Sequence, residues 1–330
     1  MTAGKLRIPL RGEEAVTVEK GLISFVLPCY RNLDRVFGTL ESVFMQDWPK
    51  LEIVITDDGS PEWEERLPAL REFIEAHRGE NITRVVYHHL AENRGTVVNT
   101  NEGYQLAQGE YIKDLAPEDM LARPDALRRY VEFLEESGCL ICFAKQEGIT
   151  EEGRAVRHLA SSADDYDALR AMTPLELRNR LFVRNCLPAP AWFAKKELFE
   201  TYGYYLPVTR LIEDYPYWIH LCSQGVKIAF LDEVLIRYRL TGSGSGNYSP
   251  MFMKDMYAIY EKCIFPLDRR YGPLQPLYNR LKRMGLDAYN DRAHWEEYSP
   301  AQKIGAWLKH GIFFAYIDWG NARIAKKNGI

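Results

Sequence analysis

Short apolar runs alternate with segments of helical spacing as far as Thr150. The apolar runs contain β-branched and aromatic residues and predict buried strands at 23–27, 53–55, 83–88, 111–112 and 140–143. Between them, apolar residues recur every three or four positions and predict helices at 34–44, 61–77, 95–107 and 124–136. Strands separated by helices imply right-handed crossovers. The pattern therefore predicts an α/β fold with a Rossmann-like, mainly parallel twisted sheet flanked by helices.

The regular alternation fades beyond Thr150, and a glycine-serine run at 242–246 is typical of a linker. We therefore expect a catalytic domain over 1–246 and a C-terminal helical extension over 247–330. The extension is rich in tyrosine, methionine and basic residues.

Composition excludes several classes of protein. A chain of 330 residues with 46% hydrophobic residues and a net charge of -4 can bury a large core and offers no basic surface for nucleic acid. Its six cysteines are scattered, as expected of buried free thiols in a reducing compartment. The N-terminal stretch lacks the apolar block of a signal peptide, and no apolar run reaches the roughly 18 residues of a spanning helix. We expect a cytoplasmic protein.

Acidic residues gather where predicted strands end. One pair, at 57–58, follows the second strand, another, at 118–119, follows the fourth, and a third lies farther along at 213–214. In an open parallel sheet, ligands bind just beyond the carboxyl ends of the strands. Because like charges repel and resist burial, carboxylates gathered there need a partner. A divalent cation that carries a phosphorylated ligand is the usual one.

Five segments in a fixed order resemble glycosyltransferase family 2, whose members have the GT-A fold. They are ISFVLPCYRN at 23–32, LESVFMQDWP at 40–49, TDDGS at 56–60, NRG at 93–95 with GEYI at 109–112, and EDYP at 213–216 with DEVLIRYR at 232–239. The resemblance covers about 21–246 and leaves out the C-terminal extension. It implies a nucleotide-binding half at about 21–120 and an acceptor half at about 121–246.

The resemblance implies a donor nucleotide site at the ends of the first strands. Tyr30, with Pro28 and Arg31 beside it, would stack on or border the base, a contact worth about 1–3 kcal/mol per base in single-strand binders. Asp58 would accept a hydrogen bond from the base, and Arg94 would reach a phosphate. Each has an ordinary alternative: Tyr30 packed on a loop, Asp58 in an Asp-Gly turn, and Arg94 as a surface arginine.

The family's acidic metal motif is altered in this chain. Many relatives have Asp-x-Asp-Asp where this chain has Ala116-Pro117-Glu118-Asp119, so the first acid is missing. The resemblance implies Mn²⁺ or Mg²⁺, with Asp119 as the direct ligand and Glu118 as a second ligand that also contacts the nucleotide ribose. One or two carboxylates suffice when phosphate oxygens and waters complete the coordination. Asp114 would point to the opposite face of a continued strand and is left out. The alternative is a short helix that starts at Pro117.

Asp214 is the catalytic base that the resemblance implies. In an inverting transfer it would take the proton of the acceptor hydroxyl while that oxygen attacks the anomeric carbon, an effect worth roughly 10²–10⁴ in rate. Arg239 would help the metal to stabilise the diphosphate leaving group. From the residues alone, an acid just before Pro216 and a helical run is more commonly a helix cap.

The acceptor site has weaker candidates. We expect it to use the segment 186–192, which includes Trp192, and the segment 202–205, with Glu213 beside the base, although most of these aromatic residues suit a core better. The family often has a histidine where this chain has Thr241, and Ser243 and Ser245 are the candidate replacements.

The resemblance thus implies a metal-dependent, inverting glycosyltransferase. It would move a sugar from a nucleoside-diphosphate donor, UDP-sugars being favoured, to a hydroxyl of a glycan or lipid-linked acceptor in surface polysaccharide synthesis. One alternative is a catalytically impaired nucleotide-sugar-binding subunit, because the first acid of the metal motif is missing. A nucleotidyltransferase is the other, but it would have a glycine-rich basic loop after its first strand, which the sequence at 28–31 is not.

The last thirty residues mix aromatic and basic side chains. The segment contains a single acid, Asp318. Its basic residues are Lys303, Lys309, Arg323, Lys326 and Lys327. A helix of this composition suits the membrane interface, which would give an otherwise cytoplasmic enzyme a peripheral contact with the inner face of the membrane. The alternative is a helix that packs on the catalytic domain or on a second copy of the chain in a homo-oligomer.

Overall fold

The computed structural model describes residues 18–150, 153–156, 166–239 and 249–328, with the backbone alone over 316–328. Its described strands form one nine-stranded sheet in the order β3-β2-β1-β4-β8-β6-β9-β5, with β7 beside β6. The strands are β1 (Glu19–Cys29), β2 (Leu51–Asp57), β3 (Ile82–His89), β4 (Gly109–Asp114), β5 (Met120–Leu121), β6 (Ile141–Ile149), β7 (Ala155–Val156), β8 (Trp192–Lys195) and β9 (Ala229–Arg239).

The first four strands form the parallel half of the sheet. β1 pairs with β2 on one side and β4 on the other, and β2 pairs with β3, all in parallel. Three helices connect them in turn: α1 (Val36–Phe44), α2 (Trp63–His77) and α3 (Thr96–Leu106). These elements confirm the alternation that the hydrophobic pattern predicts.

The other half of the sheet is mixed. β8 is antiparallel to both β4 and β6, β9 runs parallel to β6, and the short β5 is antiparallel to β9. β5 and β8 have two and four residues, so they are too short for hydrophobic periodicity to reveal them. Both depend on tertiary pairing.

Alternate residues of the central strands pack into two cores, one on each face of the sheet. Val26 and Val54 lie in the core on one face, whereas Phe25 and Ile53 lie in the core on the other face. The core that contains Val26 is covered by α3, α5 (Tyr166–Ala171), α6 (Pro174–Leu181), α7 (Lys196–Tyr202) and α8 (Asp214–Ser223). The core that contains Phe25 is covered by α1, α2 and α4 (Ala126–Ser137).

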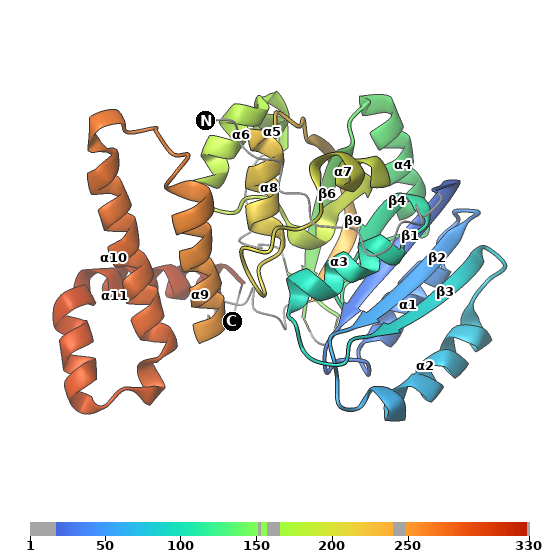
Figure 1. Ribbon diagram of the computed structural model, residues 1–330, viewed down its shortest axis with the longest axis horizontal. Helices are drawn as coiled ribbons and strands as arrows, with labels where there is room; N and C mark the ends of the chain where they lie inside the picture. The colour runs from blue at the N-terminus through green and yellow to red at the C-terminus, as the bar shows by residue number, and fades with distance from the viewer. Residues whose placement is uncertain (1–17, 151–152, 157–165, 240–248, 329–330) are drawn as a thin grey trace.

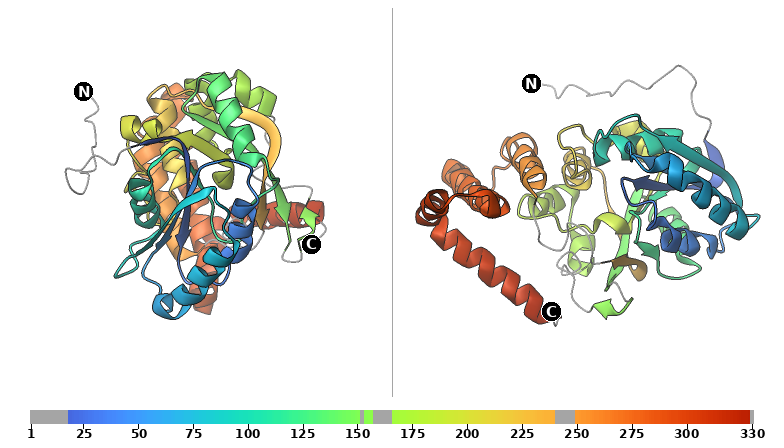
Figure 2. Two further views of the ribbon diagram at one scale, coloured as in Figure 1. Left: turned by 90° about the vertical axis from the view of Figure 1, so that its right-hand side faces the viewer. Right: turned by 90° about the horizontal axis from the view of Figure 1, so that it is seen from below.

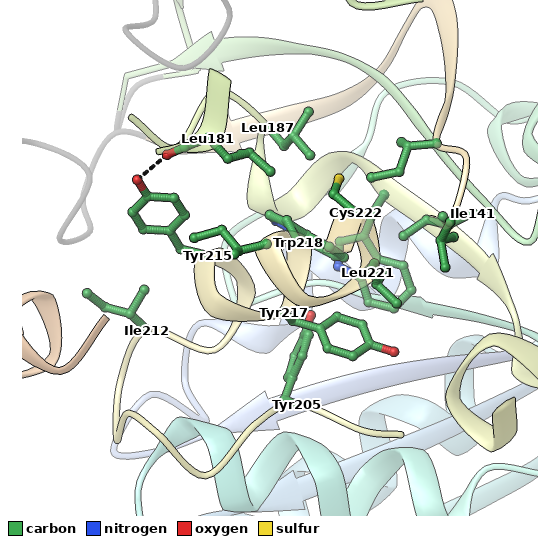
Figure 3. Close-up of a cluster of buried hydrophobic side chains, with 14 of the residues drawn as sticks. Ile141, Leu181, Leu187, Tyr205, Ile212, Tyr215, Tyr217, Trp218, Leu221 and Cys222 are labelled. Carbon is green, nitrogen blue, oxygen red and sulfur yellow. Dashed lines mark hydrogen bonds between the residues drawn. The ribbon is translucent and has the colours of Figure 1, made fainter. Parts of the chain in front are cut away.

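Helix α8 is buried on all sides, which fixes the position of its first residues. In Figure 3, Tyr217 and Trp218 of α8 lie close to Tyr205, and the rings of Tyr205 and Tyr217 meet edge to face with 5.1 Å between centroids. On the other side of the helix, the Tyr215 hydroxyl donates a hydrogen bond to the backbone oxygen of Leu181.

The C-terminal extension is helical, as predicted. Its helices are α9 (Pro250–Ile259), α10 (Gln275–Ala293) and α11 (Pro300–Asn328), and α10 and α11 form the end of the molecule opposite β3 (Figures 1 and 2). Met253 and Ile259 of α9 belong to the same core as α8, so the extension begins packed on the acceptor half. The glycine-serine run at 242–246 lies outside the described residues. None of the helices in the described ranges is long and apolar enough to span a bilayer.

Candidate active site

The candidate residues meet where the strand order reverses. β1 lies between β2 and β4, so the chain leaves β1 toward one edge of the sheet and later returns on its other side. In doubly wound sheets this switch point opens a crevice at the carboxyl ends of the strands. Tyr30 follows β1, Asp58 follows β2, and the acidic turn at 116–119 follows β4.

Asp58 fixes the loop between β3 and α3 at this edge of the sheet. Its side chain is buried, and its two carboxylate oxygens accept hydrogen bonds from the backbone N–H groups of Arg94 (2.7 Å) and Gly95 (2.8 Å). Two predicted site residues, Asp58 and Arg94, are thus connected by a hydrogen bond from the backbone N–H of Arg94. The half-exposed guanidinium of Arg94 lies 3.5 Å from the Glu102 carboxylate.

An exposed aromatic ring follows β1 at the same edge of the sheet. Tyr30 is 39% exposed, and the guanidinium of Arg31 lies 5.3 Å from the centre of its ring. Arg31 has a φ of 53°, and its N–H donates to the Ser60 hydroxyl at 2.7 Å. Pro28, which pairs with Thr56 in the β1–β2 register, is half-buried behind them.

The acidic motif is a tight turn rather than the start of a helix. The Asp119 N–H donates to the Ala116 oxygen at 3.1 Å, with Pro117 second in the turn and Glu118 third at a φ of 85°. Glycine is the usual residue at that position of a type II turn, because a side chain is strained there. Glu118 is held by the Thr39 hydroxyl, which accepts its N–H at 3.0 Å, and by an ion pair with Arg35 at 2.6 Å.

Backbone strain in the described part of the chain concentrates at this site. Arg31 and Glu118 are the two residues other than glycine that have a positive φ there. One lies at the expected base-binding end of the crevice and the other in the expected metal motif. Strained conformations of this kind cost about 1–3 kcal/mol each and tend to persist at functional sites.

Asp119 is a buried carboxyl group whose ionised form is only partly stabilised by its surroundings. Its side chain is 5% exposed, and it accepts a hydrogen bond from the N–H of Arg239, at the end of β9, at 3.1 Å. Burial raises the pKa of Asp119 to about 8, although this hydrogen bond and the nearby Lys113 act in the opposite direction. A cation bound to the Asp119 carboxylate would stabilise its ionised form. The described residues contain no cluster of three or more His, Cys, Asp or Glu side chains suited to a metal, so a bound ion would need ligands from the substrate.

Lys113 is a site residue that sequence reasoning missed. Its buried ammonium group donates to the backbone oxygens of Asp114 (2.5 Å) and Pro190 (2.7 Å) and lies 5.5 Å from the ring centre of Trp192. Burial lowers the pKa of Lys113 to about 8, and the negative charges of Asp114 and Asp119 oppose that shift. Lys113 directly follows the predicted strand at 111–112, and a lysine at the end of a strand that helices cover on both faces is the sequence signal that could have revealed it.

Asp214 is the first residue of α8 and is buried. Its Oδ2 accepts hydrogen bonds from Asn185 Nδ2 (2.8 Å) and Trp218 Nε1 (3.3 Å), and its Oδ1 accepts the Tyr215 N–H at 2.6 Å. Burial raises the pKa of Asp214, whereas these hydrogen bonds lower it. The cap position itself belongs to Glu213, which makes no side-chain capping bond. Burial and the adjacent Asp214 charge raise the pKa of Glu213 well above its usual range.

A further acid, Asp114, lies beside this pair. Strand geometry removes it from the metal ligands, and the structure places its carboxylate against Tyr104, whose hydroxyl donates to it at 2.6 Å. Burial raises the pKa of Asp114 to about 6, with a smaller rise from the charge of Asp214. The Asp114 carboxyl at the end of β4 and the Asp214 carboxyl at the start of α8 are thus close enough for their charges to interact.

The remaining candidates are more dispersed. Trp192 is 1% exposed and packs edge to face with Tyr104 and Trp218, so the structure places it in the core. The side chain of Arg239 donates to the backbone oxygen of Thr150 at 3.2 Å. Ser243 lies outside the described residues.

Comparison with known proteins identifies the family. The model of glycosyl transferase family 2 matches residues 24–203, and the chain belongs to this family and is a glycosyltransferase. The putative teichuronic acid biosynthesis glycosyltransferase TuaG of Bacillus subtilis is 26% identical over 246 residues, which cover 74% of this chain and 88% of that protein. The succinoglycan biosynthesis protein ExoO of Rhizobium meliloti is 30% identical over 135 residues, or 41% of this chain and 36% of ExoO.

Solved structures show the same fold. TarS 1–349 of S. aureus, in complex with UDP-GlcNAc, superposes with a TM-score of 0.56 at 17% identity and covers 88% of this chain and 80% of that one. The mannosyltransferase PcManGT from Pyrobaculum calidifontis, in complex with GDP-Man and Mn²⁺, gives a TM-score of 0.58 at 17% identity over 94% and 85% of the two chains. The predicted GT-A fold is confirmed.

Proposed function

We propose that this glycosyltransferase transfers a sugar from a nucleoside-diphosphate donor to an acceptor hydroxyl with inversion, and that Asp214 is the base. The observation that carries the proposal is the carboxylate of Asp214, buried at the start of α8 and oriented by Asn185 and Trp218. It lies close enough to the end of β4 for its charge to act on Asp114. A base held in this way takes the acceptor proton as the new bond to the anomeric carbon forms.

The donor nucleotide would lie along the ends of β1, β2 and β4. The exposed ring of Tyr30 offers a stacking face for the base, with Pro28 and Arg31 beside it, and the loop held by Asp58 brings Arg94 to the phosphate side. UDP is the favoured nucleotide, because TarS was solved with UDP-GlcNAc, whereas GDP, seen with PcManGT, is the second choice.

Mn²⁺ or Mg²⁺ fits the donor set of the acidic turn. Glu118 and Asp119 would hold the ion, with donor phosphate oxygens completing the coordination. The positive charge of the ion would stabilise the ionised form of Asp119, which burial disfavours. The ion would stabilise negative charge on the leaving diphosphate. Arg239, whose N–H donates a hydrogen bond to Asp119, would act on the same charge.

The acceptor is proposed to be a glycan or lipid-linked glycan of a surface polysaccharide. TuaG and ExoO carry teichuronic acid and succinoglycan biosynthesis in their names, and TuaG is aligned over most of its length. The alternative is a nucleotide-sugar-binding subunit without catalysis, for which the missing acid at Ala116 argues. Turnover in the purified protein would eliminate that alternative.

The C-terminal helices offer a contact surface for a membrane or for a second copy of the chain. One face of α11 exposes Ile304, Trp307, Leu308 and Ile312, each more than 60% exposed. Lys303 and Lys309 lie close to them in the same helix. We propose that this face brings a cytoplasmic enzyme to the inner face of the membrane, with self-association as the alternative.

The nucleotide is identified by thermal stabilisation of the full-length chain. UDP, GDP, CDP and ADP are each added with and without Mn²⁺, since a ligand that binds the native state at a hundred times its Kd stabilises it by about 2.7 kcal/mol. The proposal expects one nucleotide, UDP first, to raise the Tm and Mn²⁺ to increase the effect. No shift with any nucleotide would contradict it.

A further inference from the structure

Asp255 of α9 holds a loop of the acceptor half from within the C-terminal extension. Its side chain is 4% exposed, and its carboxylate accepts hydrogen bonds from three consecutive backbone N–H groups. The donors are Arg210, 3.0 Å from both oxygens, Leu211 at 2.6 Å and Ile212 at 3.1 Å. Consecutive N–H groups that converge in this way form an anion-binding nest, and hydrogen bonds to a charged acceptor are about twice as strong as neutral ones.

The loop that Asp255 holds runs directly into the proposed catalytic pair. The Thr209 hydroxyl donates to the Ile212 oxygen at 2.6 Å and closes the loop, and Glu213 and Asp214 follow immediately. The backbone at Ile212 therefore sets the point where α8 begins. Because a displacement of about 1 Å at a reacting group can cost on the order of 10²-fold in rate, the position of this loop matters for Asp214.

The same loop is fastened to the nucleotide side of the crevice. The Arg210 guanidinium donates to the backbone oxygen of Asn93 at 2.8 Å and also to the Asn93 side chain, and the Arg210 oxygen accepts the Val97 N–H at 3.3 Å. The two loops touch at Gly95, which has a φ of 96°, and a Cβ there would lie 2.4 Å from Arg210 Cγ. Asp58 holds the other side of the Gly95 loop.

We infer that Asp255 is a positioning residue that couples the donor loop at 93–95 to the proposed base, Asp214. Hydrogen bonds run without a break from Asp58 through that loop to Arg210 and on to Asp255. The C-terminal extension then contributes to the active site, because the Asp255 carboxylate of α9 sets the positions of the donor loop and of Asp214. The catalytic part of this inference rests on the proposed function, since it takes Asp214 as the base.

The test is Asp255→Asn in the full-length chain, with Asp287→Asn as the matched control. Asparagine keeps the shape of the side chain but removes its charge and turns an N–H₂ group toward backbone donors. Asp287 accepts the Tyr257 hydroxyl at 2.6 Å, so the control makes the same chemical change between α9 and α10 without touching the 210–212 loop. Both variants are compared with the parent by amide hydrogen exchange, by the Kd of the nucleoside diphosphate and by kcat and KM.

Asp255→Asn should speed exchange at both 93–97 and 209–214, weaken nucleotide binding several-fold and lower kcat by on the order of tenfold or more. Asp287→Asn should do none of these. Unchanged exchange at 93–97 in Asp255→Asn, or equal effects in both variants, would overturn the coupling.

If Asp255→Asn fails to fold, Arg210→Gln cuts the link to Asn93 while the backbone donors to Asp255 remain, and it should still speed exchange at 93–97. A parent protein that binds no nucleotide contradicts the proposed function separately, because the exchange measurement needs no ligand.

Discussion

Asn185 donates a hydrogen bond from Nδ2 to Oδ2 of Asp214 at 2.8 Å, across 29 positions of sequence. The bond favours the ionised form of Asp214 and so lowers a pKa that burial raises. A general base works only when it is deprotonated, so under the proposal that Asp214 is the base this contact would extend activity toward lower pH.

Asn185→Ala should therefore shift the acid limb of the pH–rate profile to higher pH. Removing the donor raises the pKa of Asp214 further, so activity should fall most at low pH and recover partly as the pH rises. The control is Asn81→Ala, which removes an amide that donates to the Gln46 and Trp48 oxygens. A uniform loss at every pH would assign Asn185 a purely structural role.

Glu118 offers a test in which stability and function move in opposite directions. Replacing Glu118 by glycine relieves a strained φ, so Glu118→Gly should be more stable to unfolding than Glu118→Ala by about 1 kcal/mol. Both variants should lose the Mn²⁺-dependent part of nucleotide affinity. Denaturant unfolding and calorimetric titration measure the two effects, and full Mn²⁺ dependence in both variants would remove Glu118 from the metal site.

Tyr30→Ala should weaken binding of the nucleoside diphosphate and leave its metal requirement unchanged. A lost stacking contact costs on the order of 1–3 kcal/mol, or about fivefold to 150-fold in Kd. Because Tyr30 is 39% exposed, the fold should tolerate the change. An unchanged Kd in titration calorimetry would leave Tyr30 without a role in the donor site.

The exposed face of α11 can be tested by point changes that spare the core. Serine at Ile304, Trp307, Leu308 and Ile312 together should reduce co-sedimentation with anionic vesicles and leave nucleotide affinity intact, because these side chains are exposed. Leu175→Ser on α6, at a site that is 54% exposed, is the control. Vesicle binding by the parent should weaken as salt rises. A parent that ignores vesicles but dissociates into monomers when the face is changed would assign the surface to self-association.

The sequence predicts the parallel half of the fold well because that half depends on local pattern. The runs at 23–27 and 53–55 and the helix between them each bury a regular set of apolar positions, and the structure contains all three. The mixed half depends on pairings between distant segments, such as Met120 with Arg237, which periodicity does not reveal.

The site divides in the same way. Asp58, Glu118, Asp119 and Asp214 stand in recognisable motifs, so the sequence locates them, although their roles remain predictions. Asn185, Asp255 and Lys113 act through contacts between distant segments, and no motif marks them. Trp192 shows the converse, because an aromatic residue near an expected acceptor site can belong wholly to the core.

The central claim is that Asp214 is the base of a nucleotide-sugar-dependent transfer. Its most direct test is the rate at which nucleoside diphosphate is released from the donor sugar by the parent and by Asp214→Asn, with Mn²⁺ and with donor binding measured alongside. The account predicts that the variant binds the nucleotide with the same Kd but turns over at least about 10²-fold more slowly. Release at near the parent rate, in a variant that is folded and binds the donor, would contradict it.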